Sequence, residues 1–159
     1  MEAAVRGLCL ISCVLFGLAI ADTAAAQPAE IMIAARSGDL ELVKELLVSG
    51  AEPDPNGIAT PLYFAAQGGH IEITELLLES GADPNALSEW GTPLHIAARR
   101  KHIGVAMILL QQGADPNSKG GELDNTPLHE ATYVGATEIG KLLIDQGADV
   151  NARNKEFEP

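Results

Sequence analysis

The stretch Thr92-Pro93-Leu94-His95-Ile96-Ala97-Ala98 decides the fold of this chain, because close copies of it occur on either side. The copies are Thr60-Pro61-Leu62-Tyr63-Phe64-Ala65-Ala66 and Thr126-Pro127-Leu128-His129-Glu130-Ala131-Thr132. A second motif begins 21 residues after each threonine, as Gly81-Ala82-Asp83-Pro84-Asn85, Gly113-Ala114-Asp115-Pro116-Asn117 and Gly147-Ala148-Asp149-Val150-Asn151. From that motif to the next threonine the distance is 11 or 13 residues. The constant spacing predicts packed structure and the variable spacing predicts surface loops.

The same frame extends toward the start of the chain. Gly50-Ala51-Glu52-Pro53-Asp54 is a degenerate second motif, and a unit that has lost the first motif begins 21 residues earlier at Ala29. Four units are therefore predicted, at about residues 29–54, 55–85, 86–117 and 118–151, and are called repeats 1 to 4. Together they form one predicted domain, residues 27–153, followed by a tail, residues 154–159.

Each unit is predicted to contain two helices. The threonine of the first motif supplies an N-cap oxygen, and the proline after it suits the first helical position, where its missing N–H costs nothing. The second helix carries a dense apolar stripe, which in repeat 3 includes Ile103, Val105 and Leu109. The glycine of the second motif is a stop signal for this helix.

The motif Thr-Pro-Leu-His-x-Ala, at a period near 33 and with a Leu-rich second helix, resembles the ankyrin repeat. The resemblance covers about residues 29–153 and implies an all-α solenoid of four helix-turn-helix repeats joined by β-turn or hairpin loops. Two departures are Tyr63 in place of the usual histidine and Lys101 in place of the turn glycine. Repeat 4 is predicted to be a terminal cap, because Glu130 and Thr132 replace apolar residues there and the tail stops before another helix pair can form.

Residues 1–26 are predicted to be a secretory signal peptide. An apolar run at residues 8–21 leads to small residues that offer a cleavage point after Ala26. The run is too short for an ordinary spanning helix, although an uncleaved anchor is the alternative. Both cysteines, Cys9 and Cys13, would leave with the signal, so the mature chain would have no thiol for a disulfide or a metal. The predicted location is the periplasm of a Gram-negative bacterium, or outside the cell.

Composition excludes several classes of partner. The chain has 159 residues, of which 47% are hydrophobic, and its formal net charge is −12. That charge opposes binding to the phosphate backbone of nucleic acids and to anionic membranes. The predicted partners therefore include no nucleic acid and, after signal cleavage, no membrane.

The sequence contains none of the catalytic motifs considered below. It contains no His-Glu-x-x-His, no Gly-x-Ser-x-Gly and no phosphate-binding loop. The family resemblance gives the four histidines framework roles: His95 and His129 would bond between repeats, and His70 and His102 would follow the turn between helices. No catalytic residue, cofactor or metal site is predicted.

Protein recognition is the function that the resemblance implies, through loop tips and the exposed side of the first helices, which together form a concave surface. Trp, Tyr and Arg are the side chains that most often carry interface energy. The predicted partner-binding residues are Phe64, Gln67, Trp90, Arg99, Arg100, Leu123, Tyr133 and Val134, and the strip also includes Ile58, Glu89 and Asp124. Two alternatives stay open: Trp90 packs its loop against the next loop, and the arginines offset nearby acids at a helix end, where cations are favourable.

The sequence therefore predicts a non-enzymatic, monomeric interaction module that binds an unidentified protein partner in the bacterial envelope. A second hypothesis is an accessory or immunity protein that inhibits, protects or assembles an envelope enzyme or toxin. A small hydrolase or metal enzyme and a purely structural role are the remaining alternatives.

Overall fold

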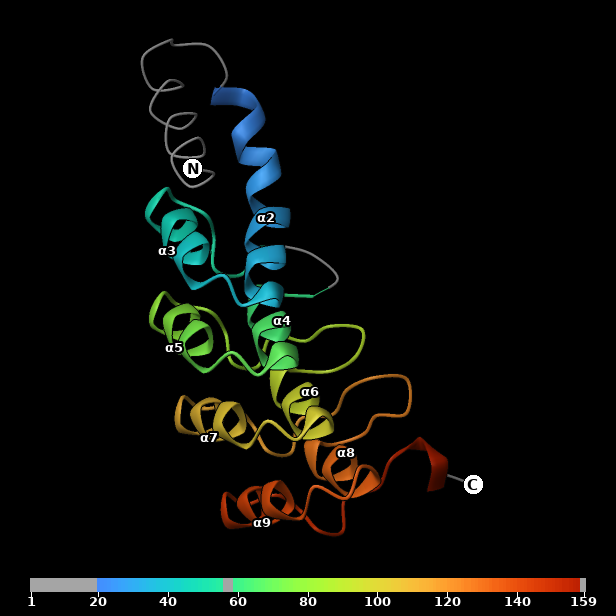
Figure 1. Ribbon diagram of the computed structural model, residues 1–159. Coiled ribbons are helices and arrows are strands. Elements are labelled where there is room, and N and C mark those ends of the chain that lie inside the picture. Colours follow the sequence, from blue (N-terminus) through green and yellow to red (C-terminus); the bar gives the residue numbers. More distant parts are fainter. Residues whose placement is uncertain (1–19, 56–58, 158–159) are drawn as a thin grey trace.

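The computed structural model describes residues 20–55 and 59–157, and these ranges contain helices and loops but no β-strand. Figure 1 shows the helices in two stacked rows. The inner row consists of α2 (Ile20–Ser37), α4 (Pro61–Gly68), α6 (Pro93–Arg100) and α8 (Pro127–Tyr133). The outer row consists of α3 (Leu40–Val48), α5 (Ile71–Glu79), α7 (Ile103–Gln111) and α9 (Thr137–Asp145). The predicted all-α solenoid of four helix pairs is confirmed.

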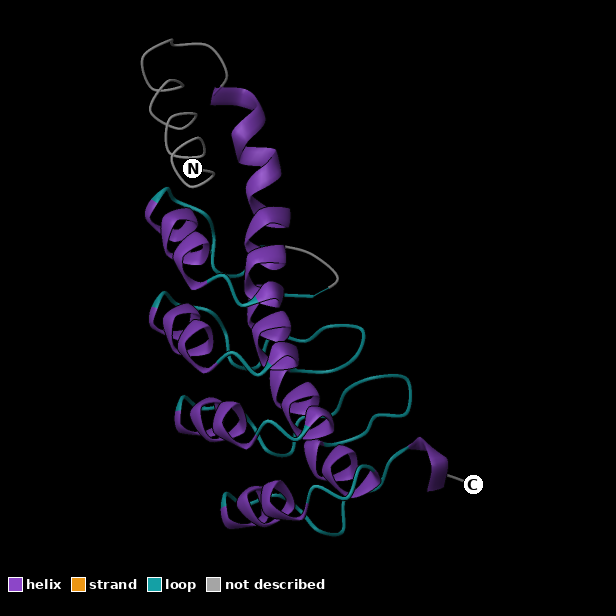
Figure 2. Cartoon of the chain, viewed as in Figure 1, coloured by secondary structure: helices purple, strands orange, loops and turns teal. Residues whose placement is uncertain are grey.

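The loops between repeats project from the inner row, on the side opposite the outer helices (Figure 2). Two of these loops are closed by single β-bridges, Ser88 with Gly91 and Gly120 with Asn125. Because the loops and the inner helices lie next to each other, side chains from both can line one surface.

The first helix of a repeat begins as its motif predicts. The Thr60 hydroxyl accepts a hydrogen bond from the Tyr63 N–H at 3.2 Å, and proline occupies the first turn of α4, α6 and α8. The turn after the helix needs a left-handed residue, which is Gly69 with φ 74° in repeat 2 and Lys101 with φ 63° in repeat 3.

The core runs through the stack between the two rows. Leu62 and Leu94 of the inner row are fully buried, as are Leu77 and Leu109 of the outer row. The paired alanines of the first motif are also fully buried in repeats 2 and 3 and leave space for the neighbouring inner helix. Burial of each such leucine contributes about 1.5–3 kcal/mol to stability.

The second motifs connect neighbouring repeats through an amide ladder. The Asn85 Oδ1 accepts from the Asp115 N–H at 2.7 Å, and its Nδ2 donates to the Gly113 carbonyl at 3.0 Å. Asn117 makes the same pair of bonds to repeat 4. Asp54 holds this position in repeat 1, where one carboxylate oxygen accepts from the Asp83 N–H and the other is buried without a partner among the residues that the structure describes. Burial raises the pKa of Asp54, although the Asp83 hydrogen bond opposes the shift.

Helix α2 begins at Ile20, so the predicted cleavage point after Ala26 lies within this helix. Pro28 also lies inside α2, where it removes one backbone donor. Residues 1–19, which hold most of the predicted signal peptide, lie outside the described residues, and its cleavage stays a prediction. Among the helices of the described ranges, none has both the length and the apolar character that crossing a bilayer requires.

Repeat 4 is the last helix pair of the described residues, but two details differ from the predicted terminal cap. Thr132 is exposed as expected, but Glu130 is only 5% exposed, because it turns inward to bind a side chain of repeat 3. The tail does not simply stop. The Lys155 N–H donates to the Leu123 carbonyl at 2.9 Å, and a 3-10 turn follows at Lys155–Phe157. The tail therefore packs against the loop of repeat 4.

Candidate partner-binding surface

One position recurs along the four inner helices, seven residues after the start of each first motif or its equivalent. It holds Arg36 in α2, Gln67 in α4, Arg99 in α6 and Tyr133 in α8. Arg36 is exposed and Tyr133 is 89% exposed, whereas Gln67 and Arg99 are half-buried. This column of unlike side chains runs along the inner row and forms the centre of the candidate surface.

A groove of about 310 Å³ lies along the first three residues of this column, and we call it the arginine groove. Its lining residues are Arg36, Tyr63, Phe64, Gln67, Trp90, Ile96, Arg99 and Arg100. They come from three inner helices and from the loop of repeat 3, so the groove exists only when the repeats stack.

The apolar part of the arginine groove is built on Tyr63, which is only 3% exposed. The Tyr63 ring lies edge-on to Phe64, with 5.8 Å between centroids, and 5.9 Å from the Trp90 ring in a tilted arrangement. Both geometries are favourable for aromatic pairs. Burial raises the pKa of the Tyr63 phenol, although nearby Arg99 and Arg100 act in the opposite direction. Trp90 packs on the Tyr63 ring of the preceding repeat, and it remains 45% exposed and available to a partner.

The three arginines of the groove have different surroundings. The Arg36 guanidinium carbon lies 5.9 Å from the centroid of the Phe64 ring, within the range of a cation–π interaction. Arg100 is exposed. Arg99 is half-buried, and its Nε donates to the Glu130 Oε2 at 2.7 Å. The alternative in which a groove arginine offsets a nearby acid therefore applies to Arg99.

The Arg99–Glu130 pair joins repeats 3 and 4. Burial alone would raise the pKa of the Glu130 carboxyl, but hydrogen bonds from Arg99 and Asn125 outweigh it and hold the pKa below its usual value. The hydrogen bond to Glu130 likewise raises the pKa of Arg99. Both groups are therefore charged at neutral pH, and the pair fixes the position of Arg99 beside the groove.

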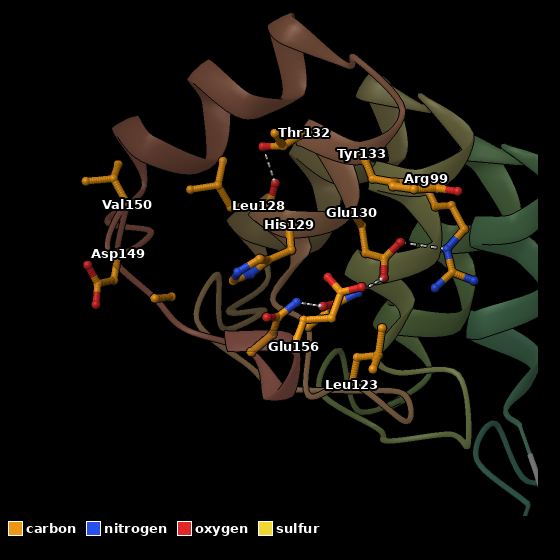
Figure 3. A pocket seen from close by; sticks show the side chains of 13 residues that line it. Arg99, Leu123, Leu128, His129, Glu130, Thr132, Tyr133, Asp149, Val150 and Glu156 are labelled. Atoms are coloured by element: carbon orange, nitrogen blue, oxygen red, sulfur yellow. Dashed lines mark hydrogen bonds and ion pairs between the residues drawn. The ribbon is translucent and has the colours of Figure 1, made fainter. Parts of the chain in front are cut away.

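A second hollow of about 770 Å³, the C-terminal pocket, lies next to this pair (Figure 3). Its lining includes Arg99, Leu123, Glu130 and Tyr133 together with tail residues. Because a carboxylate only accepts hydrogen bonds, the Asn125 Nδ2 must face Glu130, and it does so at 3.0 Å.

This orientation leaves the Asn125 Oδ1 to accept from the Asn154 Nδ2 at 2.7 Å. The Asn154 Oδ1 then lies buried without a hydrogen-bond partner among the described residues. The tail is thus connected to the Arg99–Glu130 pair through a chain of directed amide bonds.

His95 bridges repeats 3 and 4 as the family resemblance implies. The Thr92 N–H donates to its Nδ1 at 3.1 Å, so the ring proton resides on Nε2, which donates to the Asn125 carbonyl at 2.8 Å. Burial lowers the pKa of His95, because the charged form is poorly solvated there.

The other three histidines also take part in the framework. His70 and His102 contact the carbonyls of Arg36 and Gln67 in the preceding repeat, each at 3.2 Å. The His129 Nδ1 accepts a hydrogen bond from the Thr126 N–H at 3.2 Å, but its Nε2 makes no bond to a further repeat among the described residues. No group of three or more His, Cys, Asp or Glu side chains in residues 20–55 and 59–157 is arranged to hold a metal ion.

The structure brings most of the predicted partner-binding residues together. Phe64, Gln67, Trp90, Arg99 and Arg100 line the arginine groove, and Leu123 and Tyr133 line the C-terminal pocket. Arg99 lines both, so the two hollows adjoin.

Three of the four other predicted positions line neither of these two hollows. Val134 is half-buried, packs against the core and lines neither hollow. Asp124 pairs with the Lys155 ammonium at 3.1 Å. Glu89 lies beside Trp90 in a third hollow that also includes Leu123, and Ile58 lies outside the described residues.

Sequence reasoning missed several lining residues, including Tyr63 and Ile96 of the arginine groove. Arg36 was overlooked because repeat 1 has lost its first motif, although counting seven residues from Ala29 would have found it. The tail residues Asn154 and Glu156 line the C-terminal pocket, and no pattern in the repeats indicates this.

Stacked helix pairs, joined at each junction by a histidine bridge and by Asn or Asp of the second motif, define a helical repeat protein. A family model described as ankyrin repeats (3 copies) matches residues 31–120, and a model for a further ankyrin repeat matches residues 123–155. The chain therefore belongs to the ankyrin-repeat family. Comparison with curated proteins gives no significant match. Ankyrin repeats are in general protein–protein interaction modules and are typically not enzymes.

Proposed function

We propose that this chain is a non-enzymatic module that binds a protein partner along its inner helices and loops, with Trp90 and Tyr133 as the principal anchors. The observation that supports this proposal is the exposure of two large aromatic side chains beside adjoining hollows: Trp90 is 45% exposed and Tyr133 is 89% exposed. Large aromatic rings gain much buried area at a small cost in side-chain entropy, so they are frequent hot spots.

The test compares two double variants as bait in capture from an envelope extract. W90A/Y133A should lose the protein that the wild type retains, by about tenfold or more, because each anchor contributes at least 1–2 kcal/mol. The control V48A/I144A removes exposed apolar side chains from the outer helices and should retain the partner. Equal retention by W90A/Y133A and the control would contradict the proposal.

Tyr133→Ala alone is a second variant that guards against misfolding. Tyr133 is almost fully exposed, so its removal should leave the thermal melting curve unchanged while weakening capture. Identification of the captured protein as an envelope enzyme or toxin would favour the accessory or immunity role over a general adaptor.

We also propose that the mature protein acts in the bacterial envelope or outside the cell. The support is the apolar run with its small-residue cleavage point, together with Pro28, which cleavage after Ala26 would place in the first turn of the shortened helix, where proline fits. Expression in a Gram-negative host with N-terminal sequencing of the exported fraction tests this. A first residue of Gln27 is expected, whereas retention of the intact chain in the cytoplasm would overturn it.

A further inference from the structure

The arginine groove has a charge opposite to that of the chain as a whole. The chain has 22 acidic and 10 basic residues, yet the groove lining contains three arginines and no acidic side chain. Only five arginines are present in the entire sequence. A cationic groove on a protein with a net charge of −12 favours an anionic occupant at that place.

The charge of the groove is available to a ligand. Arg36 and Arg100 are both exposed, and neither forms an ion pair within the described residues. Arg99 is partly neutralised by Glu130, with 2.7 Å between the Nε and the Oε2. A planar guanidinium binds a carboxylate with two parallel hydrogen bonds, so the two open arginines are suited to two carboxylates.

The groove also has an apolar part between its arginines. Tyr63 and Ile96 are buried beneath it, and Phe64 and Trp90 remain partly accessible. A ligand that carried charge alone would leave these side chains uncovered. The occupant that matches both features has carboxylates and at least one apolar or aromatic group close together.

We propose that the arginine groove binds an acidic peptide segment in which carboxylate side chains alternate with apolar or aromatic ones. This inference rests on the proposed function, because the segment would belong to the protein partner. Arg36 and Arg100 bind the carboxylates, and Trp90 with Phe64 covers the apolar side chain. Arg99 is a positioning residue that connects the groove to repeat 4.

The net charge of the chain does not prevent this binding. At physiological ionic strength the Debye length is about 8 Å, so distant surface acids are screened, whereas arginines in direct contact with a carboxylate are screened much less. A nucleic acid is a poorer fit, because its phosphate charge continues beyond the groove and would be repelled by a chain whose net charge is −12.

The test uses the full mature chain and two pools of short peptides. In the first pool Glu alternates with Leu, Ile or Phe, and in the second Gln replaces every Glu. Binding is followed by the fluorescence of Trp90, which is the only tryptophan in the chain and lines the groove. The acidic pool should bind at least tenfold more tightly than the neutral pool, since charge-assisted hydrogen bonds are about twice as strong as neutral ones.

Single substitutions test whether the acidic peptides bind at the arginine groove. Arg36→Gln and Arg100→Gln should each weaken binding of the acidic pool by about tenfold. Lys44→Gln and Lys141→Gln remove equal charge from the outer helices and should change binding less than twofold. Arg36→Lys keeps the charge but loses the paired geometry, so it should restore only part of the affinity.

Equal binding of the two pools, no binding of either, or tighter binding of a deoxythymidine decamer would overturn the acidic-peptide assignment. None of these results decides the proposed function, which fails only if W90A/Y133A still captures the partner. Unchanged binding of the acidic pool to the Arg36 and Arg100 variants would likewise overturn the assignment, because the peptide would then bind elsewhere.

Discussion

The junction between repeats 2 and 3 and the junction between repeats 3 and 4 use the same motif position in different ways. In repeat 3 this position holds His95, which bridges to the Asn125 carbonyl of repeat 4 at 2.8 Å. In repeat 2 it holds Tyr63, whose ring packs on Trp90 of repeat 3 with 5.9 Å between centroids. At this one motif position, an aromatic pair contributes to the first junction and a buried hydrogen bond contributes to the second, while the asparagine ladder is common to both.

The difference has energetic consequences. An aromatic pair contributes about 0.5–1.5 kcal/mol beyond its buried area and is insensitive to pH. A buried hydrogen bond contributes a similar net amount, but removal of one partner leaves the other unsatisfied at a cost of about 1–3 kcal/mol. We therefore expect the junction between repeats 3 and 4 to be the more sensitive to mutation and to acid.

Substitution of His95 should give the largest effect. His95→Ala removes a bridge between repeats and the contacts to Thr92 and leaves a buried cavity, so the free energy of unfolding should fall by about 3 kcal/mol. His129→Ala should cost less than about 1 kcal/mol, because His129 has the local contact without the bridge. Urea denaturation followed by circular dichroism measures both. Equal losses would show that the bridge contributes nothing and that the local contact accounts for the stability.

Acid should weaken the polar junction selectively. The folded-state pKa of His95 is lowered, mainly by burial, so the unfolded chain binds more protons and stability falls as pH drops below the ordinary histidine value of 6.5. The pKa of Glu130 is also lowered, through its hydrogen bonds from Arg99 and Asn125, and its contribution is lost as pH falls below 4.5.

Variants separate the two acid effects. His95→Ala should flatten the stability profile between pH 7 and 5 relative to the wild type. Glu130→Gln should lower the free energy of unfolding by about 2 kcal/mol at pH 7 and flatten the profile below pH 4.5. Parallel profiles for wild type and both variants would contradict this account.

The amide ladder extends the comparison to repeat 1, where an acid occupies the asparagine position. Asp54→Asn supplies the missing donor toward the Gly81 carbonyl, as Asn85 does toward Gly113, and should stabilise the protein by about 1 kcal/mol at pH 7. The pKa of Asp54 is raised in the folded state by burial, so the wild type gains stability from this group as pH falls and the benefit of asparagine should shrink toward pH 4.

The matched control for Asp54→Asn is the reverse substitution at the equivalent position of repeat 2. Asn85→Asp removes the donor to Gly113 in the next repeat and should lower the melting temperature by several degrees. If Asp54→Asn instead lowers the melting temperature, the unpartnered oxygen of Asp54 is not a defect of the ladder.

The helix pairs could be predicted because short motifs determine them, and the His95 bridge could be expected from the resemblance to the ankyrin repeat. Threonine and proline fix where an inner helix begins, and their spacing fixes the repeat. The burial of Glu130 could not be predicted from its own repeat, because it depends on Arg99, which is 31 residues earlier in the chain. The return of the tail depends in the same way on a chain of side-chain amides that the repeat pattern does not contain.

The turn after the inner helix gives the smallest expected effect on stability. It holds glycine in repeats 1 and 2 but Lys101 in repeat 3. A Cβ added at Gly69 would lie 2.7 Å from the ring of His102 in the next repeat, and one at Gly38 would lie 2.7 Å from the ring of His70. Lys101 occupies this turn position in repeat 3 and has a Cβ. In repeat 4 the position of His70 and His102 is taken by Ala136. The lysine is tolerated because the histidine that would meet it is absent.

Lys101→Gly should therefore stabilise the protein by only about 0.5 kcal/mol, because relief of the left-handed backbone, worth about 1–2 kcal/mol, is offset by the greater freedom of glycine in the unfolded chain. Ala136→His should destabilise the wild type through a clash with Lys101. In the Lys101→Gly background the same histidine can reach the Arg99 carbonyl, as His70 and His102 reach theirs, and should no longer destabilise. A double-mutant cycle that gives no coupling between the two positions would show that the lysine and the alanine are unrelated departures from the repeat pattern.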